Sequence, residues 1–126
     1  MANYLGAVGI AVRDMEASAT FYAHAFGMRE LQRFNLPHMD EIVMGFEGRS
    51  AAVVLMQYTD DIARPPHAFA GKLVFYFEDV VSVAKRAVEA GAVMVREPAP
   101  VPGLGPTLIG FVKDPDGYTL ELLQPA

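Results

Sequence analysis

The stretch VGIAVRD at residues 8–14 decides the fold, because its pattern returns as LVFYFED at residues 73–79. Each copy is a short apolar run rich in β-branched or aromatic residues, which is typical of a strand. Each run is followed by an aspartate, Asp14 or Asp79, whose side-chain oxygen can accept from the free N–H groups at a helix start. Self-similarity at a fixed offset indicates a duplicated structural unit.

A helix is predicted after each aspartate, over Met15–Phe26 and Val80–Ala90. Gly27 and Gly91 then stand where a left-handed C-terminal cap is wanted. Apolar residues about one turn apart predict the buried stripe of each helix. These residues are Phe21, Tyr22 and Phe26 in the first helix, and Val81, Ala84 and Val88 in the second.

Further strands are predicted after each helix. They cover residues 41–46 and 52–58 in the first half, and residues 92–96, 107–112 and 118–123 in the second. Turn residues such as Asp114-Pro115-Asp116-Gly117 separate the last strands. We therefore predict an α+β fold of two tandem βαβββ modules, at about residues 4–59 and 71–124, joined by a linker at about 60–70.

The alternation of side chains along a strand predicts which residues face a cavity. Bulky Val8, Ile10 and Val12 are expected to pack on the helix, as are Tyr118, Leu120 and Leu122. Applied to the first and last strand of each module, the repeat offsets of 65 and 66 pair Ala7 with Lys72 and Leu55 with Glu121. Lys72 and Glu121 are thus predicted to point into one concavity and to form an ion pair.

Composition excludes several classes of function. The chain is 52% hydrophobic, carries a net charge of −5 and has no clustered Lys or Arg, so no nucleic-acid partner is expected. No apolar run approaches the roughly 20 residues that span a membrane. No signal peptide is visible, and the absence of Cys is compatible with the cytoplasm, so we expect a cytoplasmic protein.

The duplicated pattern resembles a known superfamily. The opening AVRDMEASATFYAHAFGM at residues 11–28 and the ending FVKDPDGYTLELLQ at residues 111–124 are similar to those of vicinal-oxygen-chelate proteins, and the ending especially to bacterial glyoxalase I. The resemblance covers essentially the whole chain. It implies a cupped, barrel-like mixed sheet with the helices on its convex face, and a homodimer.

The resemblance also implies four metal-ligand positions, typically two His and two Glu. Here these positions hold Ala7, Leu55, Lys72 and Glu121. Only Glu121 has a ligand type, and Lys72 carries a cation where a His ligand stands in metal-dependent members. A divalent site commonly needs three or more suitable ligands. We therefore expect neither a metal site nor a cofactor.

Two catalytic candidates follow. Glu121 matches the general base of glyoxalase I, and its alternative role is a structural carboxylate in a salt bridge or dimer interface. Lys72 is either an electrophile that stabilises an enolate or binds a carboxylate, or simply the partner of Glu121 or a solvated lysine. Ligand-contact candidates are Gln57, Tyr76, Thr119, His38 and His67. The Pro-rich segment 97–106 is either a lid or a stiff connector.

Three functions remain open at this point. The first is a glyoxalase or bleomycin-resistance-like protein that binds a small, partly apolar or aromatic molecule without metal. The second is a metal-independent isomerase or lyase, in which Glu121 abstracts a proton next to a carbonyl and Lys72 stabilises the oxyanion. The third, disfavoured by the lost ligands, is a metal-dependent lactoylglutathione lyase or a dioxygenase.

Overall fold

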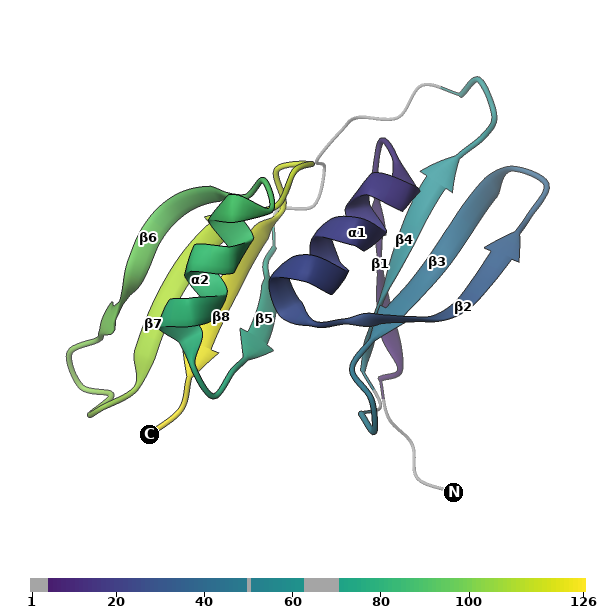
Figure 1. The fold of residues 1–126 in the computed structure, drawn as a ribbon. Coiled ribbons are helices and arrows are strands. Elements are labelled where there is room, and N and C mark those ends of the chain that lie inside the picture. The colour runs from purple at the N-terminus through teal and green to yellow at the C-terminus, as the bar shows by residue number, and fades with distance from the viewer. Residues whose placement is uncertain (1–4, 50, 63–70) are drawn as a thin grey trace. The chain divides into compact units, whose positions relative to one another are not determined.

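The computed structural model of the chain describes residues 5–49, 51–62 and 71–126. The first half comprises β1 (Ala7–Ala11), α1 (Met15–Phe26), β2 (Arg29–Asn35), β3 (Met39–Gly45) and β4 (Ala52–Tyr58). The second half comprises β5 (Leu73–Tyr76), α2 (Val80–Glu89), β6 (Val93–Pro100), β7 (Leu108–Lys113) and β8 (Thr119–Gln124). Each half is thus a βαβββ module (Figure 1), which confirms the predicted α+β duplication. No helix in the described part of the chain is long and apolar enough to cross a membrane.

The two halves have the same sheet topology. Each forms a four-stranded mixed sheet, in the order β1-β4-β3-β2 in the first half and β5-β8-β7-β6 in the second. The first strand of each half pairs with its last strand in parallel, and the remaining pairs are antiparallel. We call these halves unit 1, which includes α1 up to Ala23, and unit 2, which also takes in His24–Phe26. Each unit is described by itself.

Both helices begin at the predicted aspartate. The side chain of Asp14 accepts from two backbone N–H groups of α1, and that of Asp79 accepts from Ser82 N at 3.2 Å. These bonds satisfy N–H groups that have no partner inside a helix. Gly27 ends α1 with φ 76°, a left-handed conformation that favours glycine.

A second bond, repeated in both units, ties the last strand to the start of the helix. The side-chain carbonyl of Gln57, in β4, accepts from Met15 N at 2.9 Å. That of Gln124, in β8, accepts from Val80 N at 2.9 Å. Gln57 and Gln124 are therefore equivalent residues of the two units.

Two local predictions were wrong, and a third segment contains more strand than was predicted. Strand β2 was not predicted, because its sequence RELQRFN is polar and every residue is exposed at the edge of the sheet. Helix α2 buries Val80, Val83, Ala84 and Ala87, while Val81 and Val88 are exposed, so the predicted stripe is rotated by one residue. The strand predicted at residues 92–96 extends as β6 to Pro100, into the segment 97–106, whose role as a lid or a connector stays a prediction.

Helix α2 packs on one face of the unit 2 sheet. It contacts β6, β7 and β8, and residues such as Val112, Leu120 and Leu122 of that face are fully buried. Alternation places the neighbouring side chains on the other face, which we call the helix-free face.

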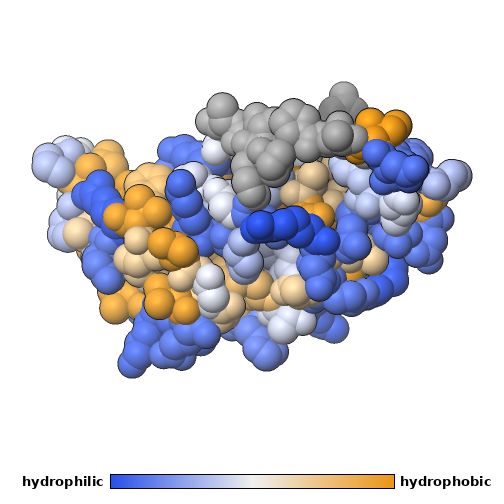
Figure 2. Space-filling model, turned by 90° about the horizontal axis from the view of Figure 1, so that it is seen from above, coloured by the Kyte–Doolittle hydropathy of each residue, from blue (hydrophilic) through white to orange (hydrophobic). Residues whose placement is uncertain are grey.

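Figure 2, viewed from above, shows apolar side chains gathered at the left, where unit 2 lies in Figure 1. Exposed apolar residues of unit 2 include Val93, Val95 and Leu104.

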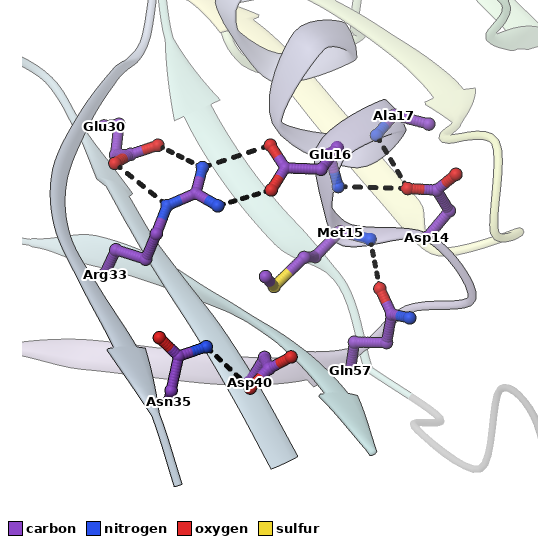
Figure 3. A network of polar contacts seen from close by, with 9 residues as sticks. All are labelled: Asp14, Met15, Glu16, Ala17, Glu30, Arg33, Asn35, Asp40 and Gln57. Carbon is purple, nitrogen blue, oxygen red and sulfur yellow. Dashed lines mark hydrogen bonds and ion pairs between the residues drawn. The ribbon is translucent and has the colours of Figure 1, made fainter. Parts of the chain in front are cut away.

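An ion-pair network ties α1 to β2 in unit 1 (Figure 3). The guanidinium of Arg33 donates to Glu16 of α1 and, at 2.8 Å, to Glu30 of its own strand. The hydrogen bonds from Arg33 lower the pKa of both carboxyl groups, and they in turn raise the pKa of Arg33. The network is solvent-exposed, so we assign it to positioning β2 rather than to chemistry.

Candidate functional site

The helix-free face of unit 2 is built from three rows of side chains that cross the sheet. In a ladder, directly paired residues point to the same face, and alternate residues of one strand share it. The first row holds Lys72, Thr119, Lys113 and Val93; the middle row holds Val74, Glu121, Phe111 and Arg96; the third row holds Tyr76, Leu123, Ile109 and Ala99. Lys72 comes just before β5 and lies beside Thr119, because the next residue, Leu73, pairs with Leu120.

The predicted ion pair lies on this face. The ammonium of Lys72 donates to the carboxylate of Glu121, whose side chain is only 9% exposed, while that of Lys72 is 50% exposed. The Lys72 ammonium also lies 5.8 Å from the centroid of the Phe111 ring, within the range of a cation–π contact. A buried carboxylate is costly unless it is paired, so Lys72 satisfies a charge that the fold has removed from water.

The other predicted ligand contacts are dispersed. Tyr76 and Thr119 lie on the helix-free face, and Tyr76 is 67% exposed. Gln57 belongs to unit 1, where its carbonyl oxygen caps α1. His38 is in the exposed turn between β2 and β3, and its backbone carbonyl accepts from Thr59 N. His67 lies outside the described residues.

One position in the predicted cavity was wrong by a residue. In the ladders, Ile10 pairs with Leu55 and Phe75 pairs with Leu122. Leu55 therefore corresponds to Leu122. Both are fully buried, on the face of the sheet opposite to the one predicted to line the cavity. The residue of unit 1 that corresponds to Glu121 is Val54. The offset between the units grows by two residues from the first strands (Ile10 to Phe75) to the last strands (Leu55 to Leu122), whereas the predicted offsets of 65 and 66 allowed for only one.

The corrected set of four positions is Ala7, Val54, Lys72 and Glu121. One carboxylate beside an ammonium does not suit a divalent cation, which needs several anionic or neutral donors and repels a cation in its first coordination sphere. Within residues 5–49, 51–62 and 71–126, no group of three or more His, Cys, Asp and Glu is placed to hold a metal ion. The residue types therefore do not fit the metal that the resemblance implies.

Sequence reasoning missed three side chains of the helix-free face, namely Phe111, Lys113 and Arg96. The alternation of Phe111 and Lys113 was visible in the sequence. Their pairing with Glu121 and Thr119 depends on the β7–β8 register, and that of Arg96 depends on a bulge in β6. Such irregularities are set by tertiary packing and carry little local signal.

Comparisons with known proteins agree with this architecture. The sequence model of the Glyoxalase/Bleomycin resistance protein/Dioxygenase superfamily matches residues 4–122. A lactoylglutathione lyase of Haemophilus influenzae is 32% identical over 117 residues, which cover 90% of this chain and 86% of that protein. A probable lactoylglutathione lyase of Vibrio cholerae is 35% identical over 118 residues, covering 90% and 84%.

A solved structure extends the likeness to three dimensions. The crystal structure of glyoxalase I from Zea mays superposes with a TM-score of 0.82 at 30% sequence identity and covers 96% of this chain. The chain spans only 44% of the length of that maize protein. Since the family match, the relatives and the duplicated topology all extend over nearly the whole sequence, this chain belongs to the glyoxalase/bleomycin resistance protein/dioxygenase superfamily.

Proposed function

We propose that the protein binds a small, partly apolar or aromatic molecule on the helix-free face of unit 2, without a resident divalent metal. The observation that carries this proposal is the ion pair between Lys72 and the buried Glu121. An ammonium bonded to the carboxylate that the family uses as a ligand competes directly with a metal ion for that carboxylate.

The surroundings of the pair support a ligand with apolar parts. Phe111 lies beside the ammonium, and Val74 and Tyr76 are exposed on β5, the strand that follows Lys72. Small-molecule sites commonly combine apolar walls with a few polar groups that fix orientation. Here Thr119 and the exposed side of Lys72 offer those polar groups.

A metal-independent isomerase or lyase is the second candidate, and the burial of Glu121 favours it. A carboxylate held in an apolar setting is a suitable proton acceptor when a substrate displaces its partner. In this mechanism Lys72 moves from Glu121 to the substrate oxygen and stabilises the negative charge that develops there. The relatives named lactoylglutathione lyase make S-lactoylglutathione the first substrate to try.

Calorimetric titration with ZnCl2 and with NiCl2 tests the metal-free proposal. We expect no saturable binding to the wild type, and we expect Lys72→His to gain weak binding because it places an imidazole beside Glu121. Glu121→Gln in the Lys72→His background is the matched control and should lose that gain. Stoichiometric binding to the wild type would contradict the proposal and favour a metal-dependent lactoylglutathione lyase or dioxygenase.

Turnover separates the binder from the enzyme. Wild type and Glu121→Gln are incubated with S-lactoylglutathione in D2O while exchange of the lactoyl α-proton next to the thioester carbonyl is followed by NMR, with and without NiCl2. A binder shows no change in either protein. Metal-independent turnover that Glu121→Gln abolishes would establish the lyase instead.

A homodimer in the cytoplasm completes the proposal. Exposed apolar side chains of unit 2, such as Val93 and Val95, support association with a second copy, because apolar patches are costly in water. Light scattering after gel filtration should give twice the chain mass at micromolar concentration. A monomer at that concentration would contradict the dimer, and fractionation of expressing cells tests the compartment.

A further inference from the structure

The helix-free face of unit 2 has a charge opposite to that of the whole protein. The chain carries a net charge of −5. The rows of this face nevertheless contain three basic residues, Lys72, Lys113 and Arg96, and one acidic residue, Glu121. This local excess of positive charge indicates what the face attracts.

Only one of the three basic residues on this face is paired with the acidic residue. Glu121 balances Lys72, to which it is bonded. Arg96 and Lys113 are exposed, and neither has a carboxylate partner among the described residues. Two uncompensated cations therefore remain on the face, and a ligand that brings a negative charge gains from both.

Polarity also changes along the strands. The first row contains two lysines and Thr119 beside one apolar residue, Val93. The middle row combines Glu121 and Arg96 with the apolar Val74 and Phe111. The third row contains no charged residue. It consists of Tyr76, Leu123, Ile109 and Ala99. A molecule that matches this surface has a charged end and an apolar end.

We propose that the ligand of this face is a small amphiphilic organic anion, in the class of the aromatic monocarboxylates. Its carboxylate lies near Lys72, Lys113 and Arg96, and its apolar body lies along Phe111 towards Leu123. This inference rests on the proposed function and adds the chemical class and the orientation of the ligand.

Three naphthalene compounds of similar shape but different charge test the proposed chemical class of the ligand. They are 2-naphthoate, 2-naphthamide and the 2-naphthylmethylammonium ion, titrated into ¹⁵N-labelled protein while amide shifts are followed. We expect amide shifts in β5, β6, β7 and β8. Since one exposed charge changes affinity roughly fivefold or less, the anion should bind about tenfold more tightly than the neutral amide. The cation should bind most weakly, and added salt should weaken the anion alone.

Variants test the orientation. Lys113→Gln should weaken 2-naphthoate about fivefold and leave 2-naphthamide unchanged. Lys85→Gln is the matched control, because it removes the same charge from an exposed position of α2 and should change neither affinity. Leu123→Ala should weaken the anion and the amide alike, because both lay the same ring on the third row.

The outcomes distinguish this inference from the proposed function. If 2-naphthamide or the cation binds this face as tightly as 2-naphthoate, the class is wrong while small-molecule binding stands. If Lys85→Gln weakens 2-naphthoate as much as Lys113→Gln does, the attraction is not local and the orientation is wrong. If no probe shifts the amides of this face, both the inference and the proposed function fail.

Discussion

Separating Lys72 from Glu121 should affect stability asymmetrically, because the two side chains are buried to different degrees. The side chain of Glu121 is 9% exposed and that of Lys72 is 50% exposed. Lys72→Met leaves a buried carboxylate without its cation. Glu121→Gln leaves an ammonium that water already reaches, beside an amide oxygen that can still accept a hydrogen bond.

The expected magnitudes follow from this exposure. Removing one partner of a fully buried pair costs about 3–5 kcal/mol. Water reaches the Lys72 side of this pair, so we expect Lys72→Met to lower the free energy of unfolding by about 2 kcal/mol. Glu121→Gln should cost about 1 kcal/mol, the value of an ordinary hydrogen bond. The double variant Lys72→Met/Glu121→Leu should be more stable than Lys72→Met alone, because no charge is left buried.

Urea unfolding at pH 7 measures these differences as shifts of the midpoint at constant slope. Glu47→Gln serves as the control, because the Arg29–Glu47 pair is 64% and 82% exposed and its loss should cost no more than about 0.5 kcal/mol. A larger loss for Glu121→Gln than for Lys72→Met, or equal losses, would refute this account of the pair.

Three further changes test other parts of the fold. The buried hydroxyl of Ser18 has no hydrogen-bond partner among the described residues. Ser18→Ala should therefore raise the free energy of unfolding by about 1 kcal/mol, and a lower value would contradict this. A Cβ at Gly110 would lie 2.9 Å from backbone of the β6 bulge, so Gly110→Ala should lower thermal stability by about 1–3 kcal/mol. Arg33 lowers the pKa of Glu16 and Glu30 below the ordinary 4.5, so its stabilisation is present above that pH and lost as pH falls below it. Urea unfolding should therefore show Arg33→Gln as less stable than wild type at pH 7, with the difference closing at pH 3.

Local signals predicted the helices well. Asp14, Asp79 and Gly27 act within one turn of the backbone they cap, so their residue types alone place the helix ends. Helix α2 shows the limit of this approach. Its valines lie on both sides, and packing on the sheet selects Val80 and Val83 over Val81. That choice depends on tertiary contacts and not on the periodicity of the sequence.

Long-range register was harder to predict. The pairing of Lys72 with Glu121 was correct, because each lies within two residues of a strand end that the sequence marks clearly. Leu55 was placed on the wrong face, because the offset of 66 predicted for the last strands is one residue shorter than the offset of Leu55 from Leu122. The signal that could have corrected it is Gln57, which corresponds to Gln124 and fixes the true offset.

The corrected register also explains why the candidate site belongs to unit 2. The row of unit 1 that corresponds to Val74, Glu121, Phe111 and Arg96 holds Gly9, Val54, Val43 and Gln32. That row has no charge, and a Cβ at Gly9 would lie 2.7 Å from the sulfur of Met56, so the Met56 side chain covers the position where unit 2 exposes Val74. The two units therefore share one backbone topology, but only unit 2 carries ionisable side chains on this row. A ligand that depends on charge should therefore leave the amides of β1, β3 and β4 unshifted wherever it shifts those of β5, β7 and β8.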